Sequence, residues 1–553
     1  MLGMNRVTYD MEYSQARRKQ VNDTENPQFN FATGDQYVYG NKDWNAQLGY
    51  FGRINYDYAG RYLVEANLRY DGTSVFGAEQ RWRWYPSFSA GWRVSEEAFM
   101  EPIKEAVSAL KLRASWGKIG DQSVPNSLYV STLSSGSTVS WIGGDGNLLS
   151  YVGTPTSVAR DITWQDISTL DIGLDARFLN GELGLTFDWF RRKTENLIVP
   201  NQDLTYTYGT SSLKGNYGNL HTDGWELGID YSHQFKNGLR ITANATLSDF
   251  QTTIDNYGNV NGLDENYKGK RYGDIWGYKV ERLYQKDDFV YDADGNLIKE
   301  KIMTGKGAGK EIYKLKDPNA HNQAYLQTGS LLFGPGDVMY KDLDGDGEIT
   351  YGDNTIDNHG DKVVIGNSTP RYQYSFRLGA DWKGFDLSFF FQGVGKCDMW
   401  GSSSLTLAGF NTGDGGIAKR FSTDYWREDR TNAFYPRPVN MGNDTNSFNM
   451  CRSDRYLLNM AYLRLKNITL GYTLPVHLTK KAFIQKARIY ASCENLITWD
   501  HLDGTPVDPE AAVLKTADYE YLTNSSTSDY AGGRVGVGTP AFRTMSIGIQ
   551  LTF

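Results

Sequence analysis

Apolar and polar residues alternate strictly in segments of about ten residues, and this pattern recurs along the whole chain. From residue 372 to residue 382 every second residue is apolar, and charged or small polar residues stand between them. Because side chains of a β-strand point alternately to its two faces, each such segment predicts a strand with one apolar and one polar face. The chain is therefore expected to be all-β, with a sheet between an apolar surrounding and a wet interior.

The alternation predicts about fourteen strands, and their connections fall into two kinds. Tight, mostly glycine-containing turns alternate with long polar segments, as in a transmembrane antiparallel β-barrel with short periplasmic turns and large extracellular loops. If the chain ends in the periplasm, counting backwards places the long segments outside the cell, and the largest, 253–370, is expected to contain a hairpin around 275–280. The predicted strands are 2–18, 47–58, 61–71, 83–95, 109–118, 165–179, 182–198, 223–235, 239–252, 371–382, 385–397, 458–474, 486–499 and 541–553.

Composition argues against several other classes of protein. Mean hydropathy is -0.53, and the sequence lacks the run of about 18 apolar residues that a transmembrane helix needs. The net charge of -8 arises from interspersed acidic and basic residues, which does not indicate a nucleic-acid surface. The 3 cysteines and 6 histidines show neither disulfide nor metal spacing, and no nucleophile stands beside a base. An enzyme is therefore not expected.

The two ends of the sequence differ in character. The first residues lack the basic region, apolar core and cleavage site of a signal peptide, so the chain is expected to be a portion of an exported protein. The last strand alternates up to the final residue, with Phe553, Leu551 and Ile549 on its apolar face. Such a strand resembles the signal read by the machinery that inserts outer-membrane barrels, although any edge strand can alternate in this way.

One segment, 342–353, has the spacing of an EF-hand-type calcium loop. In such loops alternating carboxylates converge on a hard cation, and a glycine at position 6, here Gly347, permits the sharp turn. A calcium ion that stiffens the outer segment is expected, and an acidic, glycine-rich solvated turn is the alternative. Position 12 carries Asp, which reaches less far than the usual Glu. The predicted ligands are Asp342, Asp344, Asp346, Glu348, Thr350 and Asp353.

Aromatic residues of the outer segments are candidate substrate contacts, because sugar rings offer apolar C–H faces that stack on aromatic side chains. Packing within a loop, or a place in the aromatic belt at the membrane interface, is the alternative for each of them. The glycine-rich segment 305–310 lacks the spacing of a phosphate-binding loop and is expected to be a flexible loop. The candidate contacts are Tyr129, Trp141, Tyr151, Trp400, Tyr425 and Trp426.

Several ordered stretches resemble the SusC/RagA family of TonB-dependent transporters. Among them are PSFSAGWR at 86–93 and YLRLKNITLGY at 462–472, and others lie at 50–72, 112–117, 187–194, 366–372, 391–395 and 494–496. The resemblance implies a barrel of about twenty-two strands around an N-terminal plug. The whole chain, 1–553, is then expected to be the C-terminal part of that barrel, with the plug absent from it.

The resemblance also implies a function. The full protein would import a large substrate, an oligosaccharide or a peptide, through the outer membrane, with a SusD-like surface lipoprotein as a lid. The TonB complex would supply energy through the plug and the N-terminal part, and no covalent chemistry is needed. Two alternatives stay open: a passive porin or structural barrel, and a soluble, secreted all-β glycan-binding protein.

Overall fold

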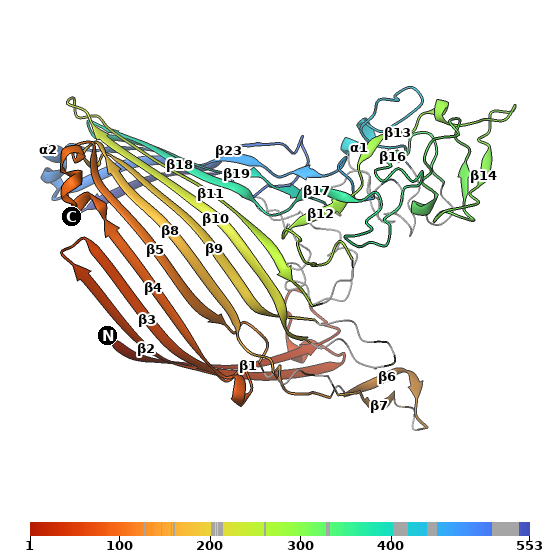
Figure 1. Ribbon diagram of the computed structural model, residues 1–553, viewed down its shortest axis with the longest axis horizontal. Helices are drawn as coiled ribbons and strands as arrows, with labels where there is room; N and C mark the ends of the chain where they lie inside the picture. The colour runs from red at the N-terminus through yellow and green to blue at the C-terminus, as the bar shows by residue number, and fades with distance from the viewer. Residues whose placement is uncertain are drawn as a thin grey trace.

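One antiparallel sheet of 14 strands dominates the computed structural model, and its strands follow one another in sequence order. The structure describes residues 1–553 except 127, 134, 145, 147, 156–157, 159–160, 201–204, 206, 208–213, 259–261, 328–331, 402–418, 439–448, 450 and 511–540. Figure 1 shows a curved sheet of long strands, and β1 and β24 form its two edges. The predicted fold class is confirmed. The strands are β1 (Leu2–Arg18), β2 (Gln36–Tyr58), β3 (Tyr62–Thr73), β4 (Trp82–Arg93), β5 (Val107–Asp121), β8 (Gln165–Phe178), β9 (Leu183–Pro200), β10 (Lys214–Gln234), β11 (Arg240–Asn256), β18 (Arg371–Trp382), β19 (Phe385–Lys396), β22 (Tyr462–Thr473), β23 (Lys486–Asp500) and β24 (Thr544–Thr552).

The two ends of the sheet differ as predicted. At one end the strands are joined by tight turns, such as the two-residue turn in which Lys383 and Gly384 both have positive φ, 47° and 89°. This backbone matches the twist of a hairpin. The longer turn after β4 contains the 3₁₀ helices Val94–Glu96 and Ala98–Ile103, and α2 (Val476–Thr479) follows β22. Figure 1 places α2 and both chain termini at this end, and the long connections at the other.

Two wall strands begin earlier than predicted. β2 starts at Gln36 instead of 47, and β10 starts at Lys214 instead of 223. Residues 36–46 pair with 8–18 of β1 through their backbones, but they have no continuous apolar face, and the side chain of Val38 is 85% exposed. The alternation that predicts a membrane strand is lost where the two-stranded ribbon extends beyond the apolar surrounding. The sequence pattern therefore predicts strands that are too short.

The remaining described strands form five two-stranded sheets in the connections, so the described residues contain no separate plug domain. The strand predicted around 275–280 is split into β12 and β13. These pair with β17 and β16 across the large loop instead of with each other. The five pairs are β6 (Ser135–Ile142) with β7 (Leu148–Val152), β12 (Asp274–Gly277) with β17 (Val363–Asn367), β13 (Val280–Leu283) with β16 (Val338–Tyr340), β14 (Lys299–Lys301) with β15 (Glu311–Tyr313), and β20 (Asp398–Met399) with β21 (Leu458–Asn459).

Two of the long connections share one apolar core beyond the rim of the sheet. We call the described residues of 263–367 and 419–461 the outer module; its second part contains α1 (Lys419–Thr423). Tyr340 from the first part and Tyr456 from the second are both buried in the common core. The buried carboxylate of Asp337 joins the two parts, because it accepts hydrogen bonds from Arg437 and Asn449, each at 2.7 Å. Figure 1 shows this module projecting from the ends of the strands. No helix among the described residues is long and apolar enough to cross a membrane.

Candidate functional site

The sheet has one polar and one apolar face, because register partners on neighbouring strands point to the same side. Arg113, Gly173 and Asp188 are register partners on three successive strands, whereas their neighbours at 112, 174 and 187 are apolar. Large apolar side chains such as Ile54, 73% exposed, cover the second face. The polar face contains a hollow of about 440 Å³, whose lining includes Asn55, Glu65, Ser89, Lys111, Arg113 and Asp171.

Ion pairs on the polar face lie across a glycine of the strand between them. The guanidinium of Arg113 on β5 passes over Gly173 on β8, and its Nη2 donates to Oδ2 of Asp188 on β9 at 2.8 Å. A Cβ atom at Gly173 would lie 2.4 Å from Oδ1 of Asp188, so the flat position of the pair depends on the glycine. The same arrangement recurs in Arg177–Gly184–Asp230 and in Asp386–Gly471–Arg488.

The predicted calcium loop lies on the outer module, and three carboxylates converge beside it. One oxygen each from Asp342, Asp344 and Asp361 lie within 4.8 Å of one another. Asp361 is fully buried, and its two oxygens accept hydrogen bonds from the backbone N–H groups of Leu343 and Thr350, both at 2.7 Å. Oxygen ligands of this kind suit a hard cation such as calcium. Burial raises the pKa of Asp361, and the charges of Asp344 and Asp342 add to the effect although the two backbone hydrogen bonds oppose it.

The structure brings Asp361, and not Asp353, to the converging carboxylates. The carboxylate of Asp353 instead accepts a hydrogen bond from Nδ2 of Asn358 at 2.7 Å and lies 3.6 Å from Nζ of Lys306. The EF-hand spacing presupposes a helix after the loop, whereas here the chain turns and returns, so that the N–H of Asp361 donates to the carbonyl of Thr350. The third carboxylate of the cluster therefore comes from a later residue than the spacing predicts.

The other predicted loop positions serve the fold of the loop itself. Oδ1 of Asp346 accepts from the N–H of Glu348 at 2.8 Å, and Thr350 is buried. Oε2 of Glu348 accepts from the N–H of Lys306 at 2.8 Å, and Nζ of Lys310 donates to two backbone carbonyls. The segment 305–310, which the sequence predicts to be flexible, is thus held to the acidic loop through Lys306 and to residues 325–327 through Lys310.

The predicted aromatic contacts differ in their surroundings. Trp426 is 7% exposed in the core of the outer module, and its Nε1 donates to Oε1 of Gln285 at 3.2 Å, which corrects its assignment as a substrate contact. Tyr425 and Trp400 pack against the same core. Tyr151 on β7 is exposed and Tyr129 is half-buried, whereas the side chain of Trp141 lies outside the described ones.

The apolar end of the last strand is exposed. Phe553 is 75% exposed, and Leu551 and Ile549 on β24 present their side chains on the same apolar face. Ile549 is 68% and Leu551 45% exposed, which agrees with a strand face that contacts lipid. Its recognition by the insertion machinery stays a prediction.

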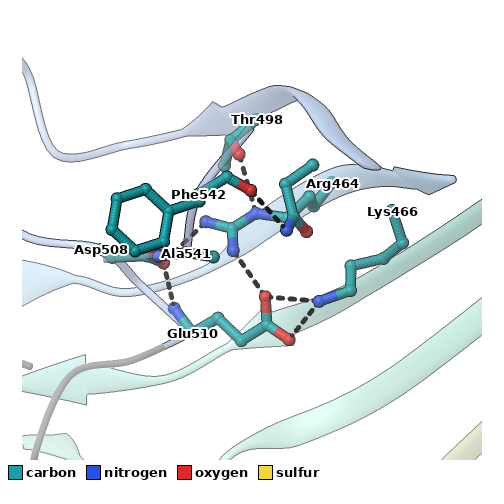
Figure 2. Close-up of polar contacts among 8 residues, drawn as sticks. Arg464, Lys466, Thr498, Asp508, Glu510, Ala541 and Phe542 are labelled. Atoms are coloured by element: carbon teal, nitrogen blue, oxygen red, sulfur yellow. Dashed lines mark hydrogen bonds and ion pairs between the residues drawn. The ribbon is translucent and has the colours of Figure 1, made fainter. Parts of the chain in front are cut away.

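Sequence patterns did not single out Arg464, yet it forms the most buried ion-pair cluster at the outer rim. Figure 2 shows its guanidinium between two strands and the segment that follows β23. Its Nε donates to Oγ1 of Thr498 at 2.8 Å, its Nη2 to Asp508 at 2.6 Å, and its Nη1 to Glu510. The ammonium of Lys466 also binds Glu510, at 2.7 Å. A charged residue within the apolar stretch 462–465 is the one sequence feature that marks the cluster.

Asp508 is the acidic centre of this cluster. Burial opposes its charged form, but hydrogen bonds from Arg464 and from the N–H groups of Ala541 and Glu510 outweigh that cost and hold its pKa below the usual range. Next to Ala541, the carbonyl of Phe542 accepts a hydrogen bond from Nδ2 of Asn495 on β23 at 3.0 Å. The segments before and after residues 511–540 therefore meet the wall at one place.

A curved antiparallel sheet with a polar face, an apolar face, tight turns at one end and long connections at the other is the wall of a transmembrane β-barrel. The family described as "TonB dependent receptor-like, beta-barrel" matches residues 2–301, and the chain belongs to this family. Its β-barrels are outer-membrane proteins.

Similarity to individual proteins indicates which type of TonB-dependent receptor this chain is. The chain is 28% identical to TonB-dependent receptor P3 of Formosa agariphila over 516 residues, which are 91% of this chain and 45% of that protein. It is 27% identical to TonB-dependent receptor SusC of Bacteroides thetaiotaomicron, over 84% of this chain and 41% of that protein. The fold matches a structure of the RagAB peptide importer in its closed-closed state with a TM-score of 0.71 and 20% identity, over 100% of this chain and 53% of the other. The SusC/RagA type is thereby confirmed, and the chain spans about half the length of these relatives.

Proposed function

We propose that this chain forms the wall and outer loops of a SusC-type importer that carries a large hydrophilic substrate through the outer membrane. The polar face of the sheet carries this proposal, because several of its charged side chains form ion pairs that lie flat across glycines such as Gly173. Such a face is hydrated and has few projections, and it suits the passage of a substrate better than catalysis. Family membership supports a transporter and not an enzyme.

The substrate class is an oligosaccharide or a peptide. The matched RagAB structure is that of a peptide importer, which favours a peptide for the shared fold, whereas exposed Tyr151 offers a stacking surface for a sugar. The apolar face contacts outer-membrane lipids.

Two partners complete the proposed importer. A SusD-like surface lipoprotein docks over the outer end, where the outer module provides a platform with its own apolar core. The TonB complex supplies energy through a plug and an N-terminal segment that lie outside this chain. Both partners follow from the family, and the position of the module at the outer rim supports the first.

A structural calcium ion completes the proposal for the outer module. Asp342, Asp344 and Asp361 supply its carboxylate ligands, and the apolar residue of the loop, Ile349, is fully buried in the module core. Millimolar calcium outside the cell is sufficient to occupy even a weak site of this kind. The ion would relieve repulsion among the carboxylates and stiffen the large loop.

Growth of a strain that lacks the gene for the whole protein tests the transport proposal. On a panel of glycans and peptides, we expect loss of growth on one large substrate, with rescue by the intact gene only when TonB is present. Rescue that is independent of TonB supports the passive porin. Recovery of the protein from the medium without detergent supports the secreted glycan-binding protein, and either result overturns the proposal.

A further inference from the structure

Residues 501–510, which follow β23, contact both the barrel wall and the outer module. On the wall side, Arg464 is 4% exposed and binds the carboxylates of Asp508 and Glu510. On the module side, Nη1 of Arg420 on α1 donates to Oγ1 of Thr505. The segment is therefore fastened at two places that lie on different parts of the chain.

An apolar contact lies between the two fastenings. Leu502 is 2% exposed and packs against Cys397, Met399 and Met460. These three residues stand where the chain leaves β19 and where it enters β22, at the short pair of strands β20 and β21. Residues 501–510 thus cross the pair β20–β21, through which the second part of the outer module is connected to the wall.

Helix α1, whose Arg420 donates to Thr505, is itself part of the core of the outer module. Phe421, next to Arg420, is 4% exposed, and its ring centroid lies 5.2 Å from that of Tyr435. A continuous path of contacts therefore runs from Arg464 in the wall through 501–510 to the core of the module.

We propose that residues 501–510 form a strap that couples the position of the outer module to the barrel wall, with Arg464 and Arg420 as its two fastenings. A force that displaces the module reaches Thr505 and is resisted at Asp508 and Glu510. Resistance at the wall is strong, because separating Asp508 from Arg464 would leave buried charges without partners. Coupling of this kind acts in both directions, so loosening either fastening loosens the other. The strap acts in this way whatever the substrate is.

Hydrogen exchange of the purified full-length protein in detergent tests the strap. The variants are Arg464→Gln at the wall and Thr505→Val, which removes the hydroxyl that accepts from Arg420. We expect each variant to accelerate amide exchange roughly threefold or more both in 501–510 and in α1 at 419–423. Arg113→Gln removes a wall ion pair that does not touch the strap, and it should leave both segments unchanged.

The pattern of hydrogen exchange distinguishes a strap, which couples the wall to the outer module, from a segment that is held only locally at the wall. The proposal is overturned if Arg464→Gln accelerates exchange in 501–510 but not in α1, because the wall fastening would then act only locally. If Arg464→Gln does not yield folded protein, Thr505→Val decides. Faster exchange at 506–510 and at the outer end of β22 supports the strap, and unchanged exchange there overturns it.

Discussion

Arg113 and Asp188 form an ion pair that crosses the strand between them, with Gly173 directly beneath the guanidinium. Two further pairs cross Gly184 and Gly471 in the same way. Each glycine lets a long cationic side chain lie flat and reach a carboxylate two strands away. The charged side chains of these three pairs therefore lie along the surface of the wall instead of extending into the interior.

Replacing Gly173 by Val should break the Arg113–Asp188 pair. The new side chain would occupy the space of the carboxylate, and we expect a loss of about 1 kcal/mol, the usual range for one partly exposed, hydrogen-bonded ion pair. Thermal unfolding in detergent measures the change. Gly228→Val is the matched control on the polar face of β10, because a Cβ added there would lie 3.9 Å from its nearest neighbour. Equal losses in the two variants would show that the ion pair is not the cause.

The outer module should lose calcium affinity when Asp361 is changed. We expect Asp361→Asn and Asp342→Asn each to weaken calcium binding by on the order of tenfold, because each removes a carboxylate from the cluster. Asp353→Asn should leave the affinity unchanged, since this carboxylate lies apart from the cluster. Titration calorimetry with calcium measures all three. A loss of affinity in Asp353→Asn together with an unchanged affinity in Asp361→Asn would restore the spacing-based assignment.

The sequence predicted the wall well because burial of one strand face against lipid repeats with period two. It failed where that cause is absent. Residues 36–46 extend the β1–β2 ribbon without an apolar face, so only backbone pairing reveals them. Arg464 and its partners come from separate segments, and only the fold brings them together.

The acidic loop shows a second limit of sequence reasoning. Spacing identified Asp342 and Asp344 correctly as neighbours, but the residue that joins them depends on how the chain returns. Asp361 is 19 positions after Asp342, beyond the motif. Trp426 follows the packing alternative that the sequence left open, and only the fold shows that it is a core residue of a module built from two distant connections.

Trp426→Ala should destabilise the outer module. The side chain is buried, and removal of a buried Trp costs about 3–5 kcal/mol. Hydrogen exchange of residues 278–285 measures the effect, because Nε1 of Trp426 bonds to Gln285. Tyr151→Ala is the control, since an exposed side chain on the separate β6–β7 hairpin should not change exchange there. Unchanged exchange in Trp426→Ala would contradict its place in the core.

Acid should loosen the segment 501–510. The folded-state pKa of Asp508 lies below its unfolded value of about 3.9, so its contribution to stability is present above that pH and is lost as the pH falls through the folded-state value. Hydrogen exchange of 501–510, corrected for intrinsic rates, should therefore accelerate below about pH 4. In Arg464→Gln this pH dependence should shrink, because Arg464 supplies part of the shift. A steeper dependence in the variant would contradict the assignment.

Topology in living cells tests the central account most directly. An epitope tag inserted at Met303, which is 81% exposed at the tip of β14 and β15, should bind antibody on intact cells. A tag at Asn237, in the tight turn between β10 and β11, should bind only after the outer membrane is permeabilised. Binding at Asn237 on intact cells, or the absence of binding at Met303, would contradict an outer-membrane wall with its module outside.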